Sequence, residues 1–152
     1  MPTQFLAVDV EQALVAQLAN ALAGVDVSVL GEAELNDNDE LILKTPCARP
    51  RYIESSYRSN ELTQTTYDCE HIYDIWCADE NLTSKAAQRG ASKVVVGRVQ
   101  AALAGATITL PDGSSEPVRL VGVGSFPEDE LGMIYLVRVA IPGLAQFPGG
   151  SN

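Results

Sequence analysis

The sequence has 152 residues, of which 46% are hydrophobic, so it suits one domain with a substantial core and excludes wholesale disorder. Its 20 acidic residues against 10 basic ones give a net charge of −10, which disfavours direct binding to nucleic acid. No apolar run approaches the roughly 20 residues that span a bilayer, and the first residues lack the pattern of a secretory signal. We therefore expect no contact with a membrane and a chain that stays in the cytoplasm.

A helix is predicted near the start of the chain. Asp9 is a good N-cap, and Gln12 follows three residues later, as in a capping box. Five apolar side chains repeat at helical spacing and are expected to face the core: Val10, Leu14, Leu18, Ala21 and Leu22. Gly24 then predicts the end of the helix.

Two short strands are predicted next, at 25–29 and 48–54. In the first, valines alternate with polar residues, as in a half-buried strand. The second contains Pro50, which cannot donate a ladder hydrogen bond, so we expect an edge strand or a bulged one. The polar run at 36–40 lacks the glycine and the distal glutamate of a calcium-binding EF-hand loop, so it is interpreted as a solvated turn. Residues 55–64 are predicted to form a long, mobile loop.

The longest predicted strand covers residues 65–78, and its two faces differ. One face is expected to join the core, with His71 at its rim, and consists of Tyr67, Cys69, His71, Tyr73, Ile75 and Cys77. The other face carries Asp68, Glu70 and Asp74. It is expected to be solvated along the strand up to the apolar residues Ile72 and Trp76. The three cysteines of the chain form no CxxC pair, so we interpret them as buried, reduced thiols.

The second predicted helix begins near Thr83 or Ser84 and ends at Gly105. Its buried stripe is expected to consist of Ala87, Ala91, Val94, Val95, Val99, Ala102 and Leu103. Lys85, Arg89 and Lys93 lie at positions i, i+4 and i+8 and form a basic stripe. Most such stripes are a solvated helix face. Against a net charge of −10, this one is also a candidate for docking on an acidic neighbour.

Three closing strands are predicted at 106–110, 117–125 and 131–141. A turn at Pro111–Ser114 is expected to join the first two as a hairpin. Together the elements predict an α+β fold, with a mixed, mostly antiparallel sheet and two main helices packed against it. We predict one domain over residues 1–141 and a flexible Gly/Pro-rich tail over residues 142–152.

The usual catalytic motifs are missing from the sequence. It holds no GxSxG, no P-loop, no GxGxxG at a helix start and no HExxH. Cys69 and His71 lie two residues apart on one strand face, close enough for contact, but no orienting acid accompanies them. His71 is the only histidine, too few for ordinary zinc spacing. We therefore predict no catalytic residue, no metal and no cofactor.

The order of the predicted elements carries a resemblance. A helix and a strand precede the stretch 46–52, which is followed by a long strand, a helix, a hairpin and a final strand. The second helix opens around Ala87-Gln88-Arg89-Gly90 and closes on the pattern Val-x-x-Ala-Leu-x-Gly at 99–105. From about residue 9 to 141, this arrangement resembles the Mu-like phage tail proteins of the tail terminator, or tail-completion, type.

The resemblance implies a structural role rather than an enzymatic one. It implies a virion protein that forms a ring, expected to be a hexamer, which caps the tail tube and meets the head–neck connector. DNA would pass through an acidic lumen without specific binding. A ring needs contacts in which one surface meets a different surface of the next copy. The candidate interface residues are Lys85, Arg89 and Lys93 on one side and Asp68, Glu70 and Asp74 on the other.

Three alternatives remain open at this stage. The first is another neck or tail-completion subunit, which would have a similar sequence profile. The second is a small enzyme or ligand-binding protein that uses a site near His71 and the cysteines. The third is an assembly chaperone, which would be absent from the finished particle.

Overall fold

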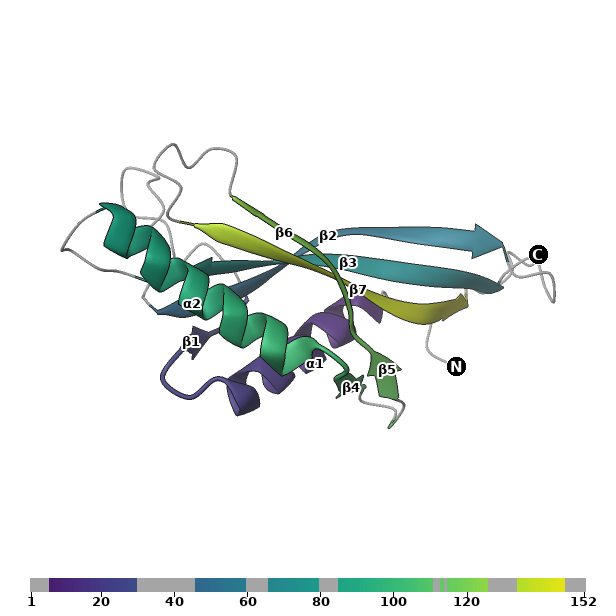
Figure 1. The fold of residues 1–152 in the computed structure, drawn as a ribbon. Coiled ribbons are helices and arrows are strands. Elements are labelled where there is room, and N and C mark those ends of the chain that lie inside the picture. The colour runs from purple at the N-terminus through teal and green to yellow at the C-terminus, as the bar shows by residue number, and fades with distance from the viewer. Residues whose placement is uncertain are drawn as a thin grey trace, which may run out of the picture.

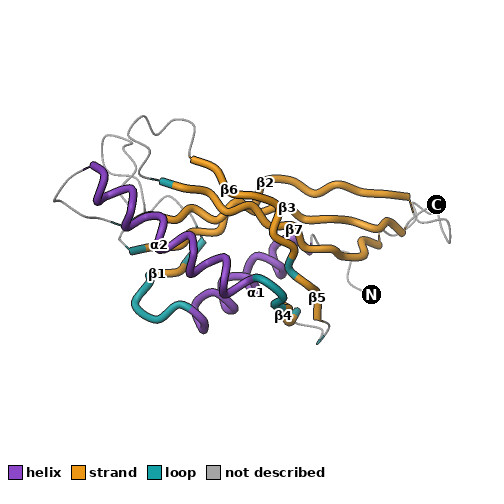
Figure 2. The backbone as a smooth tube through the Cα atoms, in the orientation of Figure 1, coloured by secondary structure: helices purple, strands orange, loops and turns teal. Residues whose placement is uncertain are grey.

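The computed structural model describes residues 6–29, 46–59, 66–79, 85–110, 113, 115–125 and 134–146. The elements are α1 (Leu6–Ala21), β1 (Asp26–Val27), β2 (Cys47–Ser59), β3 (Thr66–Ala78), α2 (Lys85–Leu103), β4 (Thr107–Thr109), β5 (Ser115–Pro117), β6 (Arg119–Ser125) and β7 (Tyr135–Gln146). Both helices lie on one face of the main sheet (Figure 1 and Figure 2). The polar run at 36–40 and residues 147–152 of the predicted tail lie outside the described residues.

The main sheet has five strands in the order β1-β2-β3-β7-β6. Only the β1–β2 pair is parallel, while β2–β3, β3–β7 and β7–β6 are antiparallel. β4 and β5 form a separate antiparallel hairpin. The predicted α+β fold, with two helices packed on a mixed, mostly antiparallel sheet, is therefore confirmed.

Helix α1 begins earlier than its capping signal predicts. It starts at Leu6, which places Asp9 inside the first turn rather than at the N-cap. An acid in the first turn still interacts favourably with the helix dipole. Val10, Leu14, Leu18 and Leu22 are buried as predicted, but Ala21 is exposed. Gly24 follows with a φ of 78°, a conformation that glycine adopts without steric cost.

Strand β2 is longer than predicted. It runs for 13 residues, so the loop predicted from residue 55 onward is wrong as far as Ser59. Residues 60–64 of that predicted loop lie outside the described residues. The pattern was misleading because a run of polar residues indicates a loop, whereas here polar side chains alternate on a strand paired with β3. The register shifts between Tyr52 and Glu54, so the strand is bulged, as Pro50 had suggested, although the bulge lies beyond the proline.

An ion pair with a buried arginine joins β1 to β2. The side chain of Arg49 is 2% exposed, and its guanidinium group donates to the carboxylate and the backbone carbonyl of Asp26. β1 pairs only with Cys47 and Ala48 of β2. Beyond Ala48, no described strand pairs with the edge of β2 that faces away from β3.

Strand β3 agrees with its prediction almost to the residue. The alternating face with Tyr73, Ile75 and Cys77 is buried in the core, Cys69 is buried farther along the strand, and Tyr67 is half-buried at its end. His71 is 2% exposed, so it lies inside the core rather than at the rim. Cys47 and Cys77 are buried as well, and all three cysteines of the chain are free thiols.

Strand β7 continues past its predicted end at Ile141. It runs through Pro142 to Gln146, paired with β3 as far as Thr66. The proline is tolerated beside an open edge, because β6 pairs only with the earlier part of β7, from Tyr135 to Ala140. The flexibility predicted for the tail stays a prediction.

Helix α2 begins at Lys85, next to its predicted start, and Gly105 with a φ of 70° follows its end. Val95, Val99 and Leu103 are buried as predicted, and Val96 joins them. Val94 is 62% exposed, so its placement in the buried stripe is wrong. The buried hydroxyl of Ser92 pairs with the backbone of Asp79, which joins the helix to the end of β3. Arg98 donates to the carbonyl oxygen of Ala23, just beyond the end of α1, at 2.8 Å.

The predicted strand at 117–125 is two strands. Residues up to Pro117 pair with β4 in the predicted hairpin, and β6 then joins the main sheet beside β7. Buried Val118 lies between them and donates its backbone N–H to Ala106.

The core lies between the helices and the half of the sheet that they cover. It combines side chains of α1 and α2 with the inward faces of β3 and β7. At the right of Figure 1, the far ends of β2, β3 and β7 extend beyond both helices. We call this part of the sheet (Ser56–Ser59, Thr66–Glu70 and Pro142–Gln146) the overhang.

Candidate functional site

The predicted acidic row lies on the sheet face opposite the helices, which we call the outer face. Asp68, Glu70 and Asp74 share it because side chains two residues apart on a strand point the same way. Their exposure is unequal: Asp68 is exposed, Glu70 is half-buried and Asp74 is 5% exposed. The three acids therefore do not form one uniform acidic surface.

Asp74 is bound by an arginine from the neighbouring strand. Arg138 of β7 is its register partner and donates to both carboxylate oxygens, from Nε at 2.8 Å and from Nη2 at 3.0 Å. The hydrogen bond and charge of Asp74 raise the pKa of Arg138. The prediction that Asp74 is solvated is wrong, because its charge is matched within the chain and its carboxylate is buried.

Glu70 has a looser partner on the edge strand. Arg119 of β6 donates to its carboxylate at 2.9 Å, and the two side chains are 60% and 39% exposed, Arg119 being the more exposed. Ion pairs this exposed are worth about 0–1 kcal/mol. Glu70 and Arg119 can therefore exchange partners at low cost.

Asp68 lies near the free end of the overhang, opposite Arg58 in the register of β2 and β3. A pocket with a volume of about 380 Å³ opens beside it, lined by Ser56, Tyr57, Arg58, Asp68, Cys69 and Glu70. Its charged walls carry both signs, from Arg58 and from the two acids. Among the sequence-predicted acids, Asp68 is the one most available to a partner.

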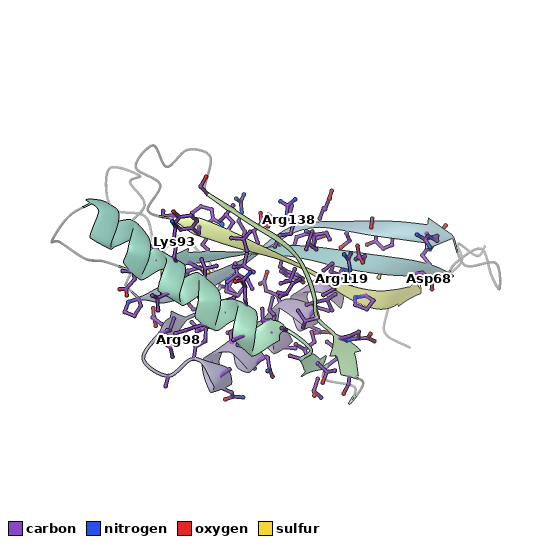
Figure 3. All side chains as sticks on the ribbon, in the orientation of Figure 1. Asp68, Lys93, Arg98, Arg119 and Arg138 are labelled. Carbon is purple, nitrogen blue, oxygen red and sulfur yellow. The ribbon has the colours of Figure 1, made fainter. Side chains whose placement is uncertain are left out.

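The basic stripe lies on α2, which covers the other face of the sheet. The helix includes Lys85, Arg89 and Lys93, and only the last has a described side chain. Lys93 is exposed, and its Nζ lies 5.9 Å from the centre of the Tyr135 ring, in cation–π geometry. Figure 3 places Lys93 on α2 and Asp68 near the opposite end of the sheet. The structure thus keeps the two predicted patches apart, on different sides of one molecule.

A chain of hydrogen bonds surrounds His71 on the inward face. The hydroxyls of Tyr52 and Ser55 lie 2.6 Å apart, and the Ser55 Oγ lies 2.7 Å from His71 Nδ1. On the other side of the ring, His71 Nε2 lies 3.5 Å from Cys69 Sγ. A side chain at Gly143 would meet both groups, with its Cβ at 3.2 Å from the sulfur, so glycine allows β7 to pack here.

The electrostatics of this chain of hydrogen bonds favour its neutral forms. Burial lowers the pKa of His71, which keeps the imidazole uncharged. Burial, followed by the charges of Asp68 and Glu116, raises the pKa of the Cys69 thiol. A nucleophilic or metal-binding cysteine acts as a thiolate, and the surroundings of Cys69 oppose that state. The arrangement is therefore a neutral hydrogen-bond network that joins β2 to β3.

Two sets of functional neighbours were not predicted from the sequence. Arg119 and Arg138 supply the counter-charges of the acidic row, but they come from strands far away in sequence. A signal existed for Arg138, because a lone charge within an otherwise apolar strand indicates a buried partner. Ser55 was missed as a partner of His71 because residues 55–64 were predicted to be a loop, and Tyr52 joins the network only through Ser55.

Comparison with known proteins gives no further assignment: no model of a protein family matches the chain, and no curated protein matches it. Within the described ranges, no group of three or more His, Cys, Asp or Glu side chains is placed to hold a metal ion. No described helix combines the length and apolar character needed to cross a membrane.

Proposed function

We propose that the chain is a structural subunit of the phage tail terminator type. In this role, copies form a ring, expected to be a hexamer, that caps the tail tube and joins it to the head–neck connector. The subunit would be assembled in the host cytoplasm and retained in the virion, with DNA passing through the ring without specific binding. The element order that resembles these proteins carries the proposal, and it is compatible with the two helices on one face of a mostly antiparallel sheet.

The separation of charged groups supports the same role. A closed ring uses two different surfaces of each subunit. Lys93 lies on α2, whereas the exposed Asp68 lies on the overhang, so two of the predicted interface residues of opposite charge lie on different parts of the molecule. The net charge of −10 is compatible with a lumen to which DNA does not adhere.

The test is the mass of the purified protein across a range of concentrations, with negative-stain images of the protein alone and mixed with tail tubes. Rings, or caps at the ends of tubes, are the expected result. A protein that stays monomeric in both samples contradicts the proposal. Detection of the protein in purified virions would distinguish a terminator, or another neck subunit, from an assembly chaperone.

The hydrogen-bonded chain around His71 favours a second candidate, a small enzyme or ligand-binding protein. In that case His71→Ala would abolish activity or binding while leaving the fold intact. The raised pKa of the Cys69 thiol speaks against a cysteine nucleophile. We therefore place this candidate second.

A further inference from the structure

We propose that the two open edges of the sheet pair with each other between copies of this chain, so that β6 of one copy adds as a strand to β2 of the next. This inference rests on the proposed ring-forming role, because it names the surfaces through which copies meet. It depends on the register of the sheet, which relates one edge to the other.

Each edge has an accessible stretch. β6 is the last strand on its side, and Val121 and Val123 on it are 46% and 47% exposed. On the other side, β1 pairs with β2 only as far as Ala48; Arg49 and Pro50 are buried, and Arg51 and Glu54 beyond them are exposed. Edge strands are usually protected by charges or prolines, yet β6 has neither after Arg119.

The register places chemically complementary residues at the same level on the two edges. Glu54 pairs with Ile72, Ile72 with Ala140, and Ala140 with Arg119, so Glu54 and Arg119 end one row across four strands. If the rows continue into a neighbouring copy, Arg119 lies opposite Glu54 on the outer face. The exposed, weakly paired Arg119 is then shared between Glu70 of its own chain and Glu54 of the next.

The rows that follow are also compatible. The residue level with Val123 is Pro50, and the residue level with Leu120 is Tyr52, so apolar side chains meet on the inward face. The row of Arg51 ends at Gly122, where a side chain would meet nothing within 4 Å. A long arginine side chain therefore finds open space opposite.

The irregularities of the two edges lie at neighbouring levels. β2 shifts register between Tyr52 and Glu54, and β6 shifts between Leu120 and Gly122. These two steps lie on opposite sides of one row, the row that contains both Tyr52 and Leu120. Each edge thus carries one extra residue over the same five rows, so 49–54 and 119–124 have the same length.

Strand direction permits the pairing. β2, β3, β7 and β6 alternate in direction, so β6 next to β2 of another copy continues an antiparallel sheet. Main-chain hydrogen bonds would supply the affinity, as in other strand additions. The contact joins two different surfaces, so it repeats from copy to copy and closes into a ring when the rotation allows. If β6 of one copy paired instead with β6 of another, Arg119 would not lie opposite Glu54.

Disulfide cross-linking tests this geometry. Within one copy, Glu54 and Arg119 are separated by three strand spacings, roughly 14 Å, whereas a disulfide needs Cα atoms about 4.4–6.8 Å apart. A Glu54→Cys, Arg119→Cys double variant can therefore be linked at these positions only between copies. Under mild oxidation we expect a ladder of dimers, trimers and higher species that reductant removes. The native cysteines are buried, which limits their interference.

The matched control is an Arg58→Cys, Arg119→Cys double variant. Arg58 is also exposed on β2, but it lies four residues beyond Glu54, about 13 Å along the strand, so the ladder should be lost. Dimers from the single Arg119→Cys variant would indicate two-fold pairing of β6 and overturn the proposal. Oligomers by light scattering without a Glu54–Arg119 ladder would overturn this interface and leave the ring-forming role standing. A chain that remains monomeric, even with tail tubes, would overturn both.

Discussion

Among the acids of the outer face, Asp74 is the one whose removal is expected to destabilise the fold. Its buried carboxylate accepts two hydrogen bonds from Arg138, and hydrogen bonds to charged groups contribute about 1.5–3 kcal/mol. We expect Asp74→Ala to lower the free energy of unfolding by about 2 kcal/mol, measured by urea denaturation. Asp68→Ala, on the same strand face but exposed, is the control and should change it by less than about 0.5 kcal/mol. Equal effects of the two variants would contradict the role assigned to Arg138.

His71 is expected to make stability depend on pH. Burial lowers the pKa of the folded imidazole below its ordinary value of about 6.5. As pH falls through about 6.5, the unfolded chain therefore binds a proton that the folded chain resists, and the free energy of unfolding decreases. Above that pH the ring is neutral in both the folded and the unfolded chain, so its titration no longer changes the free energy of unfolding. Urea denaturation at about pH 7.5, 6.5 and 5.5 measures the effect.

The control for this titration is His71→Gln, which cannot take up a proton. Other groups, such as Glu11 with its raised pKa, titrate equally in both proteins and cancel in the comparison. The variant should lose part of the decrease in stability between about pH 6.5 and 5.5. Parallel curves for the variant and the natural protein would show that His71 is not the group responsible.

At the scale of the elements, replacing glycine by alanine at two positions distinguishes the effect of backbone strain from that of helix propensity. Gly105 has a φ of 70°, so Gly105→Ala should lower the free energy of unfolding by roughly 1–2 kcal/mol. Gly97 lies exposed inside α2, and a Cβ added there would meet nothing within 4 Å, so Gly97→Ala should raise it by about 0.5–1 kcal/mol. Thermal unfolding of both variants tests the opposite signs, and a shift in the same direction would contradict the account.

Both helices, β3 and the hairpin could be predicted from local patterns, since each depends on its own periodicity and turn glycines. β2 shows where such patterns fail. Its end, Ser56–Ser59, is polar because that part of the sheet extends beyond the helices, whereas Ser55 is a polar partner of the buried His71. β7 passes through Pro142 for a related reason, since its other side is open there. The limits of those strands are set by pairing, which no local pattern contains.

The candidate site shows the same division. The alternation that places Asp68, Glu70 and Asp74 on one face could be predicted, because it is a property of one strand. Their unequal availability could not be predicted, because it depends on arginines of β6 and β7 that come into register only in the folded sheet.

At the scale of the whole molecule, one core joins both helices to the sheet, which predicts a single cooperative unfolding transition. Trp76 is the only tryptophan and is buried on the outer face, so its fluorescence reports on the sheet. Far-ultraviolet circular dichroism reports mainly on the helices. The two signals should give the same urea midpoint within error. Separate midpoints would mean that helices and sheet unfold independently.

The overhang implies that opening of the backbone is uneven along the same strands. Ser56, Tyr57 and Arg58 are consecutive and all exposed, so both faces of β2 contact water there, whereas the other end of β3 is fully packed. Amide protons in the overhang are therefore protected mainly by the ladder itself, and they exchange with solvent through local fluctuations that cost less than global unfolding. The half of the sheet that packs on the helices thus resists local opening, whereas the overhang opens more easily and can adjust its twist to a partner that it contacts.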